Sequence, residues 1–244
     1  MSSSLPSKLL AEFIGTFAFV FIGAGAAAVI GDGVGLPGIF AIAFAHGLTI
    51  MVFAFAYGSV SGGHMNPAVT IGVLAAGAMS AIEAAGYIVA QLIGGVVGAL
   101  LLAAVLGGVA TGLGTPALAH NLALGATTLT ITPGAGFVIE AVLAFFLITV
   151  VLSTAVAGRA GSLAPLAIGM TLTLNIIMGG ALTGAAFNPA RALGPMIATG
   201  NFADAWLYMT APIVGAILAA MTHVGLARLA REGTAPVPAA SAAE

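Results

Sequence analysis

Charge is what this chain has least of: its 244 residues include five Lys or Arg and seven Asp or Glu, which is 5% of the sequence. An ordinary soluble domain has roughly 25% charged residues, so this composition does not fit one. A disordered chain is also excluded, because disorder requires low hydrophobicity and 61% of this sequence is hydrophobic. The net charge of −2 also excludes nucleic acid as a partner, because phosphates require a basic face. A helical membrane protein remains, since the apolar stretches are far longer than barrel strands of about ten residues.

Cysteine is absent altogether, which excludes disulfides, thiolate metal sites and cysteine nucleophiles. No His and carboxylate cluster has the spacing of a metal site, and no Ser–His–acid constellation stands out in the sequence. We therefore expect neither a metal, nor a cofactor, nor enzymatic activity.

Long apolar segments are abundant, and a helix needs about 20 such residues to cross a bilayer. Two further apolar stretches, 66–77 and 188–199, are too short: at 1.5 Å per residue each gives roughly 18 Å of helix, about half a membrane. Six segments are long enough to span the bilayer: 9–30, 39–59, 84–106, 135–157, 163–182 and 204–227.

Basic residues predict the orientation. With six spans, Lys8, Arg159, Arg228 and Arg231 fall on one side of the membrane, and the positive-inside rule places that side, with both termini, in the cytoplasm. Ala-rich spans and a short tail favour a prokaryote, so we expect the cell (plasma) membrane. The Pro/Ala-rich segment 231–244 is expected to be a mobile C-terminal tail.

The sequence contains an internal repeat. SGGHMNPAVTIG at 61–72 recurs as TGAAFNPARALG at 183–194, and YIVAQLIGG at 87–95 recurs as YMTAPIVGA at 208–216. Each repeat therefore has three spans and one short stretch. Because three is odd, the second repeat must be inverted relative to the first, and such repeats place a ligand site at their interface.

This pattern predicts an all-α membrane protein with six transmembrane helices and two re-entrant half-helices in two inverted repeats. Repeat one covers about 8–106 and repeat two about 135–227. Together they form a single domain over residues 1–230.

The two short stretches each begin with Asn-Pro-Ala. Asn is a favoured N-cap, and Pro at the first helical position loses no hydrogen bond. An Asn-Pro pair can also mark a simple turn, but two copies at matched positions favour two helix starts. Inversion points both positive dipole ends at the midplane, which repels cations while the Asn amides can donate to a neutral molecule. The six residues are Asn66, Pro67, Ala68, Asn188, Pro189 and Ala190.

On these motifs, and on the spans AEFIGTF and IEAVLAF, roughly residues 8–227 resemble the aquaporins of the major intrinsic protein family. The resemblance implies one channel per subunit and a homotetramer in a lipid bilayer. It also implies that Glu12 and Glu140 accept hydrogen bonds from the re-entrant loops and so support them. Proton relay is the alternative role for these two carboxylates.

The resemblance also implies a selectivity filter made of His46, Ile176, Ala185 and Arg191. A charged side chain inside the membrane is expensive unless it has such a function. This set departs from the Phe, His, Thr or Cys, Arg pattern of water-selective bacterial channels and is similar to the tonoplast-intrinsic subgroup. Ile and Ala predict a wider, more apolar constriction.

Two further histidines are candidates. His120, in the long loop before the fourth span, could reach Arg191 as an extended filter residue, as a loop His does in part of that subgroup, or be solvated. His64, beside the first motif, could line the cytoplasmic vestibule or pack its own loop.

We therefore expect a passive channel for water and small neutral solutes that excludes protons and ions. The solutes are ammonia and hydrogen peroxide, with urea as a further candidate. A glycerol facilitator of the same family is the alternative, although Ala192 and Met196 replace the Asp and the basic residue typical of that group. An ion-coupled inverted-repeat transporter is the other alternative, although the spans offer only Glu12 and Glu140 for coupling.

Overall fold

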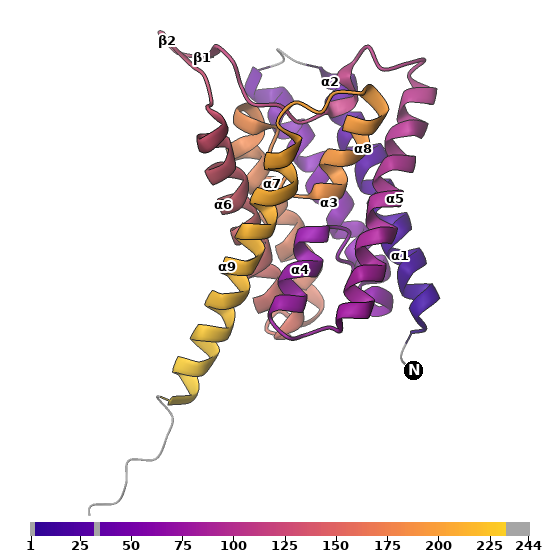
Figure 1. The fold of residues 1–244 in the computed structure, drawn as a ribbon, viewed down its shortest axis with the longest axis vertical. Coiled ribbons are helices and arrows are strands. Elements are labelled where there is room, and N and C mark those ends of the chain that lie inside the picture. The colour runs from indigo at the N-terminus through magenta and orange to yellow at the C-terminus, as the bar shows by residue number, and fades with distance from the viewer. Residues whose placement is uncertain (1–2, 32–34, 233–244) are drawn as a thin grey trace, which may run out of the picture.

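The computed structural model describes residues 3–31 and 35–232, and these form a bundle of membrane-spanning helices (Figure 1). The six predicted spans are confirmed to within a few residues. They are Leu5–Ile30, Pro37–Ser61, Ala81–Val105, Pro133–Val156, Gly161–Thr183 and Ala205–Arg231.

The helices of the first repeat include one irregular turn. The first span consists of α1 (Leu5–Ala18), a π-helical turn η1 (Phe19–Ala24) and α2 (Gly25–Ile30); the second is α3 (Gly35–Ser61), the half-helix is α4 (Pro67–Ala75) and the third span is α5 (Ala81–Val105).

The second repeat has the same order. It contains α6 (Pro133–Val151) with a π-helical turn η3 (Leu152–Val156), a 3-10 turn η4 (Gly161–Leu163), α7 (Ala164–Thr183), the half-helix α8 (Pro189–Thr199) and α9 (Ala205–Glu232).

A long connection joins the two repeats. It contains a 3-10 turn, η2 (Gly112–Gly114), and a hairpin of β1 (Leu122–Leu124) and β2 (Thr127–Leu129) in antiparallel register. The hairpin lies at the end of the bundle opposite to the start of α1 (Figure 1).

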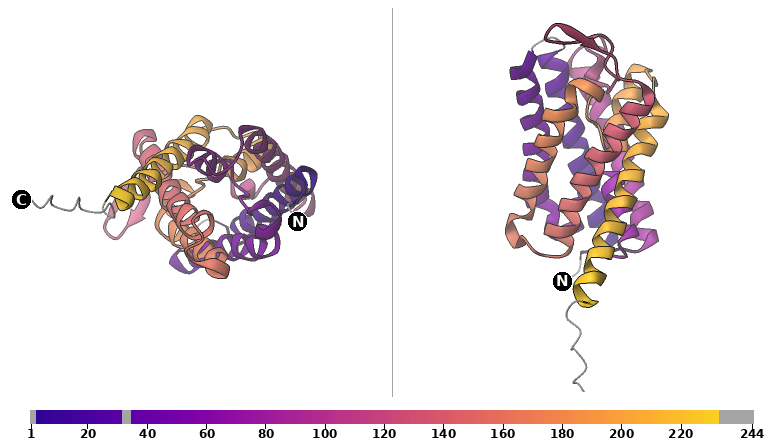
Figure 2. Two further views of the ribbon diagram at one scale, coloured as in Figure 1. Left: turned by 90° about the horizontal axis from the view of Figure 1, so that it is seen from below. Right: turned by 90° about the vertical axis from the view of Figure 1, so that its left-hand side faces the viewer.

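The two half-helices lie in opposite halves of the bundle, α4 nearer the end where α1 begins and α8 nearer the hairpin (Figure 1). In each repeat the first span packs against the third, α1 on α5 and α6 on α9, while α3 packs on α7 and so joins the repeats. Viewed along the bundle, the spans form a ring around the interior (Figure 2). This is the inverted arrangement that the sequence predicts.

Both described ends of the chain lie at the same end of the bundle, as six spans require (Figure 1). The predicted boundary of the tail needs a correction, because α9 continues as a helix to Glu232. Ala and Arg are good helix formers, so the helix continues past the end of the apolar pattern. The rest of the predicted tail, 233–244, lies outside the described residues.

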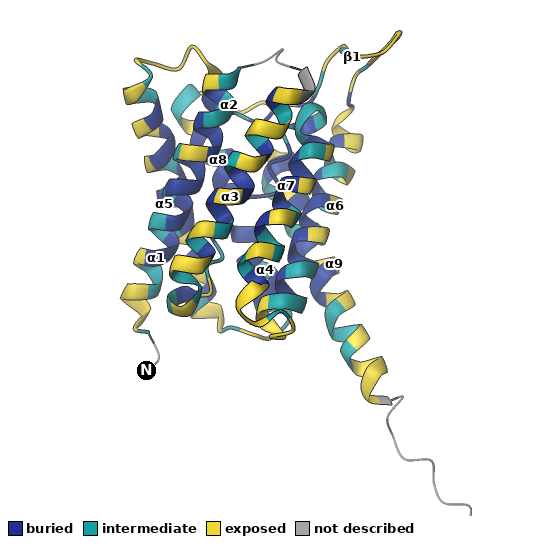
Figure 3. Ribbon diagram, turned by 180° about the vertical axis from the view of Figure 1, so that it is seen from behind, coloured by how far each residue is buried: buried dark blue, intermediate teal, exposed yellow. Residues whose placement is uncertain are grey.

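Large apolar side chains face outward around the bundle, where Figure 3 shows exposed residues alternating with a buried interior. On α3 they recur every four residues, which is the spacing of one helical face, and they are 41–55% exposed: Phe40, Phe44, Leu48 and Val52. A soluble monomer rarely exposes so much apolar surface, and lipid is the environment that suits it.

Glycines let the paired spans touch at the backbone. A Cβ on Gly94 in α5 would lie 2.5 Å from the carbonyl oxygen of Phe13 in α1, and one on Gly215 in α9 would clash with the carbonyl of Ala141 in α6. These two glycines occupy the same place in the repeated motif. In each repeat the first span therefore packs closely against the third through the same glycine contact.

Replacing Gly94 with Ala should lower the thermal midpoint of the detergent-solubilised protein, because the methyl group meets backbone that cannot rotate away. Overpacking of this kind costs about 1–3 kcal/mol. The control is Gly225→Ala in α9, where a Cβ would meet nothing within 4 Å. Equal midpoints for the two variants would contradict the proposed backbone contact.

Candidate functional site

The two half-helices begin at the Asn-Pro-Ala motifs. Asn66 is the N-cap of α4, and its Oδ1 accepts from the backbone N–H of Ala68 at 2.8 Å. Asn188 caps α8 in the same way, accepting from the N–H groups of Ala190 at 3.0 Å and Arg191 at 3.2 Å. The prolines occupy the first helical turn, where an N–H would have no partner in the helix.

The two asparagines also bind each other's loops. Asn66 Nδ2 donates to the carbonyl of Phe187 at 3.1 Å, and Asn188 Nδ2 donates to the carbonyl of Met65 at 2.9 Å. This reciprocal pair joins the half-helix starts of the two repeats at the centre of the bundle. An amide nitrogen has two N–H groups, so each of these bonds uses one of the two.

Glu12 of α1 is fully buried and binds the loop before α4. Its Oε1 accepts from Ser61 Oγ at 2.6 Å and the N–H of His64 at 2.9 Å. Its Oε2 accepts from the N–H of Met65 at 2.6 Å and from Gln91 Nε2 at 2.8 Å. Four donors thus surround this carboxylate, which compensates for its removal from water.

Glu140 of α6 binds the loop before α8 in the same pattern. Its Oε1 accepts from Thr183 Oγ1 at 2.6 Å and the N–H of Ala186 at 3.0 Å, and its Oε2 accepts from the N–H of Phe187 at 2.5 Å. The fourth donor is missing here, because Pro212 occupies the place in the repeat that Gln91 has in the other half.

Both loops contain a non-glycine residue with left-handed backbone immediately before the Asn: Met65 has φ of 50° and Phe187 has φ of 31°. Such residues cost about 1–3 kcal/mol each and persist only where their surroundings hold them. The carboxylates accept from the N–H groups of these same residues. They therefore hold the conformation that orients the carbonyls of Met65 and Phe187 toward the opposite asparagine.

Four supporting side chains were not singled out in the sequence. Ser61 and Thr183 donate to the carboxylates, and Tyr87 and Tyr208 each donate to the carbonyl of that Ser or Thr at 2.7 Å. Alignment of the repeats could have found them, because each pair occupies matched positions in the two motifs.

Arg191, in the first turn of α8, is 4% exposed. Its Nη1 donates to the carbonyl of Gly114 at 2.8 Å, so the turn η2 fixes one end of the guanidinium. Its Nε has no hydrogen-bond partner among the described residues. A buried polar atom left unpaired costs about 1–3 kcal/mol.

His46, on α3, is 1% exposed. Its Nδ1 lies 2.9 Å from the carbonyl oxygen of Ile42 and must be the donor, because a carbonyl can only accept. In the neutral ring, Nε2 is then an acceptor. Like the Nε of Arg191, His46 Nε2 has no partner among the described residues.

The other two predicted filter residues are apolar and buried. Ile176 on α7 and Ala185 in the following loop belong to one buried cluster with Phe19, whose ring contacts His46 edge-on with centroids 5.3 Å apart. The two apolar members of the set thus belong to the buried interior that also contains Phe19, whereas Arg191 comes from α8.

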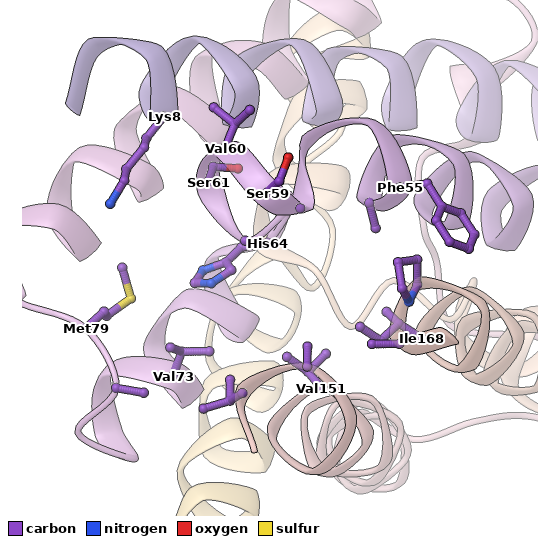
Figure 4. Close-up of a pocket in the computed structure, with 18 of the residues that line it drawn as sticks. Lys8, Phe55, Ser59, Val60, Ser61, His64, Val73, Met79, Val151 and Ile168 are labelled. Atoms are coloured by element: carbon purple, nitrogen blue, oxygen red, sulfur yellow. The ribbon is translucent and has the colours of Figure 1, made fainter. Parts of the chain in front are cut away.

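A cavity of about 840 Å³ lies at the end of the bundle where α1 begins. His64 points into it, among Lys8, Val73 and Met79 (Figure 4). The ring also packs locally, since its Nδ1 lies 3.1 Å from Thr70 Oγ1. His64 therefore both lines this cavity and packs within its own loop, and its role in a vestibule stays a prediction.

His120 lies in the connection between the repeats, and its role as an extended filter residue stays a prediction. It is exposed, and no hydrogen bond joins it to Arg191 in the part of the chain that the structure describes. The carbonyl of Gly114 makes the loop contact to the guanidinium instead. Backbone carbonyls are present at every residue, so the sequence has no signal for this partner.

Comparisons with known proteins agree with this geometry. The family model described as major intrinsic protein matches residues 1–223. The chain is 38% identical to Aquaporin TIP4-4 of Zea mays, covering 94% of this chain and 90% of that protein, and 42% identical to Glycerol uptake facilitator protein-like 6 of Lactiplantibacillus plantarum, covering 87% and 94%. A solved aquaglyceroporin from Plasmodium falciparum has the same fold, with a TM-score of 0.77 at 24% identity over 94% of this chain and all of that one.

These relatives bear on the predicted membrane. Several are plant proteins with TIP in their names, from maize, rice and Arabidopsis thaliana. The expectation of a prokaryotic plasma membrane, which rested on Ala-rich spans, therefore has no support. Alanine content reflects helix packing and genome composition together, and it does not identify a membrane.

Replacing Glu140 with Ala should strongly destabilise the protein, because the hydroxyl of Thr183 and the N–H groups of Ala186 and Phe187 lose their acceptor. Each buried unpaired donor costs about 1–3 kcal/mol. Thermal unfolding in detergent measures the effect.

The matched control is Glu83→Ala. Glu83 pairs with Lys8 at 2.6 Å, but the two side chains are 23% and 28% exposed, and pairs of this kind contribute about 1 kcal/mol or less. Similar losses in both variants would show that Glu140 does not hold the loop.

Proposed function

Because this chain belongs to the major intrinsic protein family of membrane channels, we propose that it is a passive channel for water and small neutral solutes that excludes protons and ions. The observation that carries the proposal is the reciprocal bonding of Asn66 and Asn188, each of which uses one N–H of its amide on the opposite loop. The second N–H of each amide donates to the passing molecule. Two fixed donors at the midplane suit the oxygen of water.

Ion exclusion follows from the same centre. Two helix N-termini, each equivalent to roughly half a positive charge, lie where the asparagines meet. Arg191 adds a full charge in the first turn of α8. A cation would be repelled at both places and would lose its hydration shell, whereas a neutral molecule loses only hydrogen bonds that the asparagines replace.

The constriction formed by His46, Ile176, Ala185 and Arg191 selects among neutral solutes. One side has polar atoms, Nε2 of His46 and Nε of Arg191, and the other has the apolar side chains of Ile176 and Ala185. Neither Ile176 nor Ala185 has a ring, which leaves room beyond one water molecule. Ammonia, hydrogen peroxide and urea are the solutes that this chemistry favours.

Glycerol is the second candidate, and the 42% identity to a bacterial protein named as glycerol uptake facilitator-like favours it. Against it, Ala192 follows the filter arginine and Met196 follows Gly194-Pro195. In favour of glycerol, the apolar side chain of Ile176 would suit its carbon backbone.

Two further parts of the proposal concern the assembled protein. The basic residues place the end of the bundle that contains both described termini in the cytoplasm, by the positive-inside rule. Four copies form a homotetramer with one pore in each subunit. Residues 1–230 act as one channel domain.

Reconstituted protein should increase the osmotic water permeability of liposomes well above that of empty vesicles. Parallel measurements with ammonia, hydrogen peroxide, urea and glycerol should give a large increase for the first two and a smaller one for urea. A pH-sensitive dye inside the vesicles should show no added proton leak. Water permeability equal to that of empty liposomes would refute the channel, and a glycerol flux exceeding that of urea would favour the second candidate.

Arg191→Val should raise the ratio of urea to water permeability several-fold, because it shortens the side chain that closes one side of the constriction. Arg159→Val is the matched control, since Arg159 is exposed between the fourth and fifth spans. An unchanged ratio in folded Arg191→Val protein would remove Arg191 from the filter.

A further inference from the structure

The ring of His46 rests against one short segment of the first span. Phe19 contacts it edge-on at an interplanar angle of 80°. A Cβ on Gly23 would lie 2.5 Å from Cδ2 of the ring and 2.8 Å from both Cγ and Nε2. Real Cβ atoms essentially never approach so closely, so the ring occupies space that only a glycine leaves free.

Both supporting residues belong to the π-helical turn η1, Phe19–Ala24. Helical turns of this type are rare and occur frequently at functional sites. Here the irregular turn lies directly behind a residue of the proposed filter. The sequence of the first span gives no reason of its own for the irregularity, since it contains no proline between 7 and 36.

The ring has little freedom in other directions. Its Nδ1 is bound to the carbonyl of Ile42 on its own helix, whereas Nε2 has no partner among the described residues. α3 contacts both η1 and α7, the helix that supplies Ile176. A group inserted from the first span would therefore move the Cδ2–Nε2 edge toward the constriction.

We propose that Gly23 is a specificity-determining position, which sets the width of the constriction by determining how far the His46 ring retreats toward the first span. The inference rests on the proposed function and adds a residue outside the four filter positions. A larger side chain at 23 narrows the path without changing any filter residue. Gly23 acts through His46 and does not itself contact the solute.

The test is Gly23→Ala in reconstituted liposomes, with water, hydrogen peroxide and urea as probes. We expect the ratio of urea to water permeability to fall several-fold, because the displaced ring excludes the larger molecule first. An unchanged or raised ratio in folded protein overturns the inference.

Two further variants separate this effect from general damage to the helix. Gly25→Ala, two residues along the same span, places a methyl group 3.3 Å from the flexible end of Leu102 on α5 and should leave the ratio unchanged. In a His46→Ala background, Gly23→Ala should have no further effect, since the ring that it displaces is gone. An equal effect in the presence and absence of the ring overturns the inference.

A structure determination tests the inference independently of the proposed function. A high-resolution structure of Gly23→Ala should show the His46 ring displaced away from η1, and an unmoved ring overturns the inference whatever the transport result. Failure of the unmodified protein to conduct water refutes the proposed function instead, and the ring position still decides the role of Gly23. If Gly23→Ala does not fold, the double variant should fold, because the ring that meets the new methyl group is gone; a double variant that also fails to fold overturns the inference.

Discussion

Two buried carboxylates fix the loops at the centre of this molecule. Glu12 and Glu140 each accept from the N–H of a residue with left-handed backbone, Met65 or Phe187. A carboxylate in a membrane interior is costly, and so is left-handed backbone at a bulky residue. Each cost is offset by the other, because the strained loop presents its N–H groups to the charge. The carbonyls of the same two residues then accept from the opposite asparagines, so the link between the repeats depends on these two acids.

The scaffold is nearly symmetric, and the proposed selectivity is not. Both repeats have the acid, the hydroxyl donor, the tyrosine and the capping asparagine. They differ after the motif, where Val69 in one half corresponds to Arg191 in the other. They differ again at Gln91, which adds a fourth donor to Glu12, while Pro212 has no side-chain donor to offer Glu140. The symmetric parts of the two repeats position the motifs at the midplane. The difference between Val69 and Arg191 then puts one charge on one side of it.

The sequence predicts the parts of the fold that repeat or are apolar. Span length follows from hydrophobic runs, inversion follows from three spans per repeat, and the helix starts follow from the local capping chemistry of Asn-Pro. The turn η1 and the contact between Gly114 and Arg191 could not be predicted, and the two alternatives for His120 could not be separated. They depend on backbone atoms and on long-range packing, for which residue type is no signal. The long connection between the repeats has no hydrophobic period, so nothing in the sequence shows which of its residues comes close to the guanidinium.

Two nitrogen atoms of the proposed filter have no hydrogen-bond partner among the described residues, and they limit which solutes can bind there. His46 Nε2 is an acceptor in the neutral ring, because Nδ1 donates to Ile42, and Arg191 Nε is a donor that has no partner in the described residues. Together the two atoms match the hydrogen-bonding pattern of a molecule that both donates and accepts. Water, ammonia, hydrogen peroxide and urea all do so, whereas an inorganic cation offers neither group and meets the charge of Arg191. The selection that we propose, for small, neutral, hydrogen-bonding solutes, therefore depends on which nitrogen of His46 has the proton, and that is determined by one backbone carbonyl on the same helix.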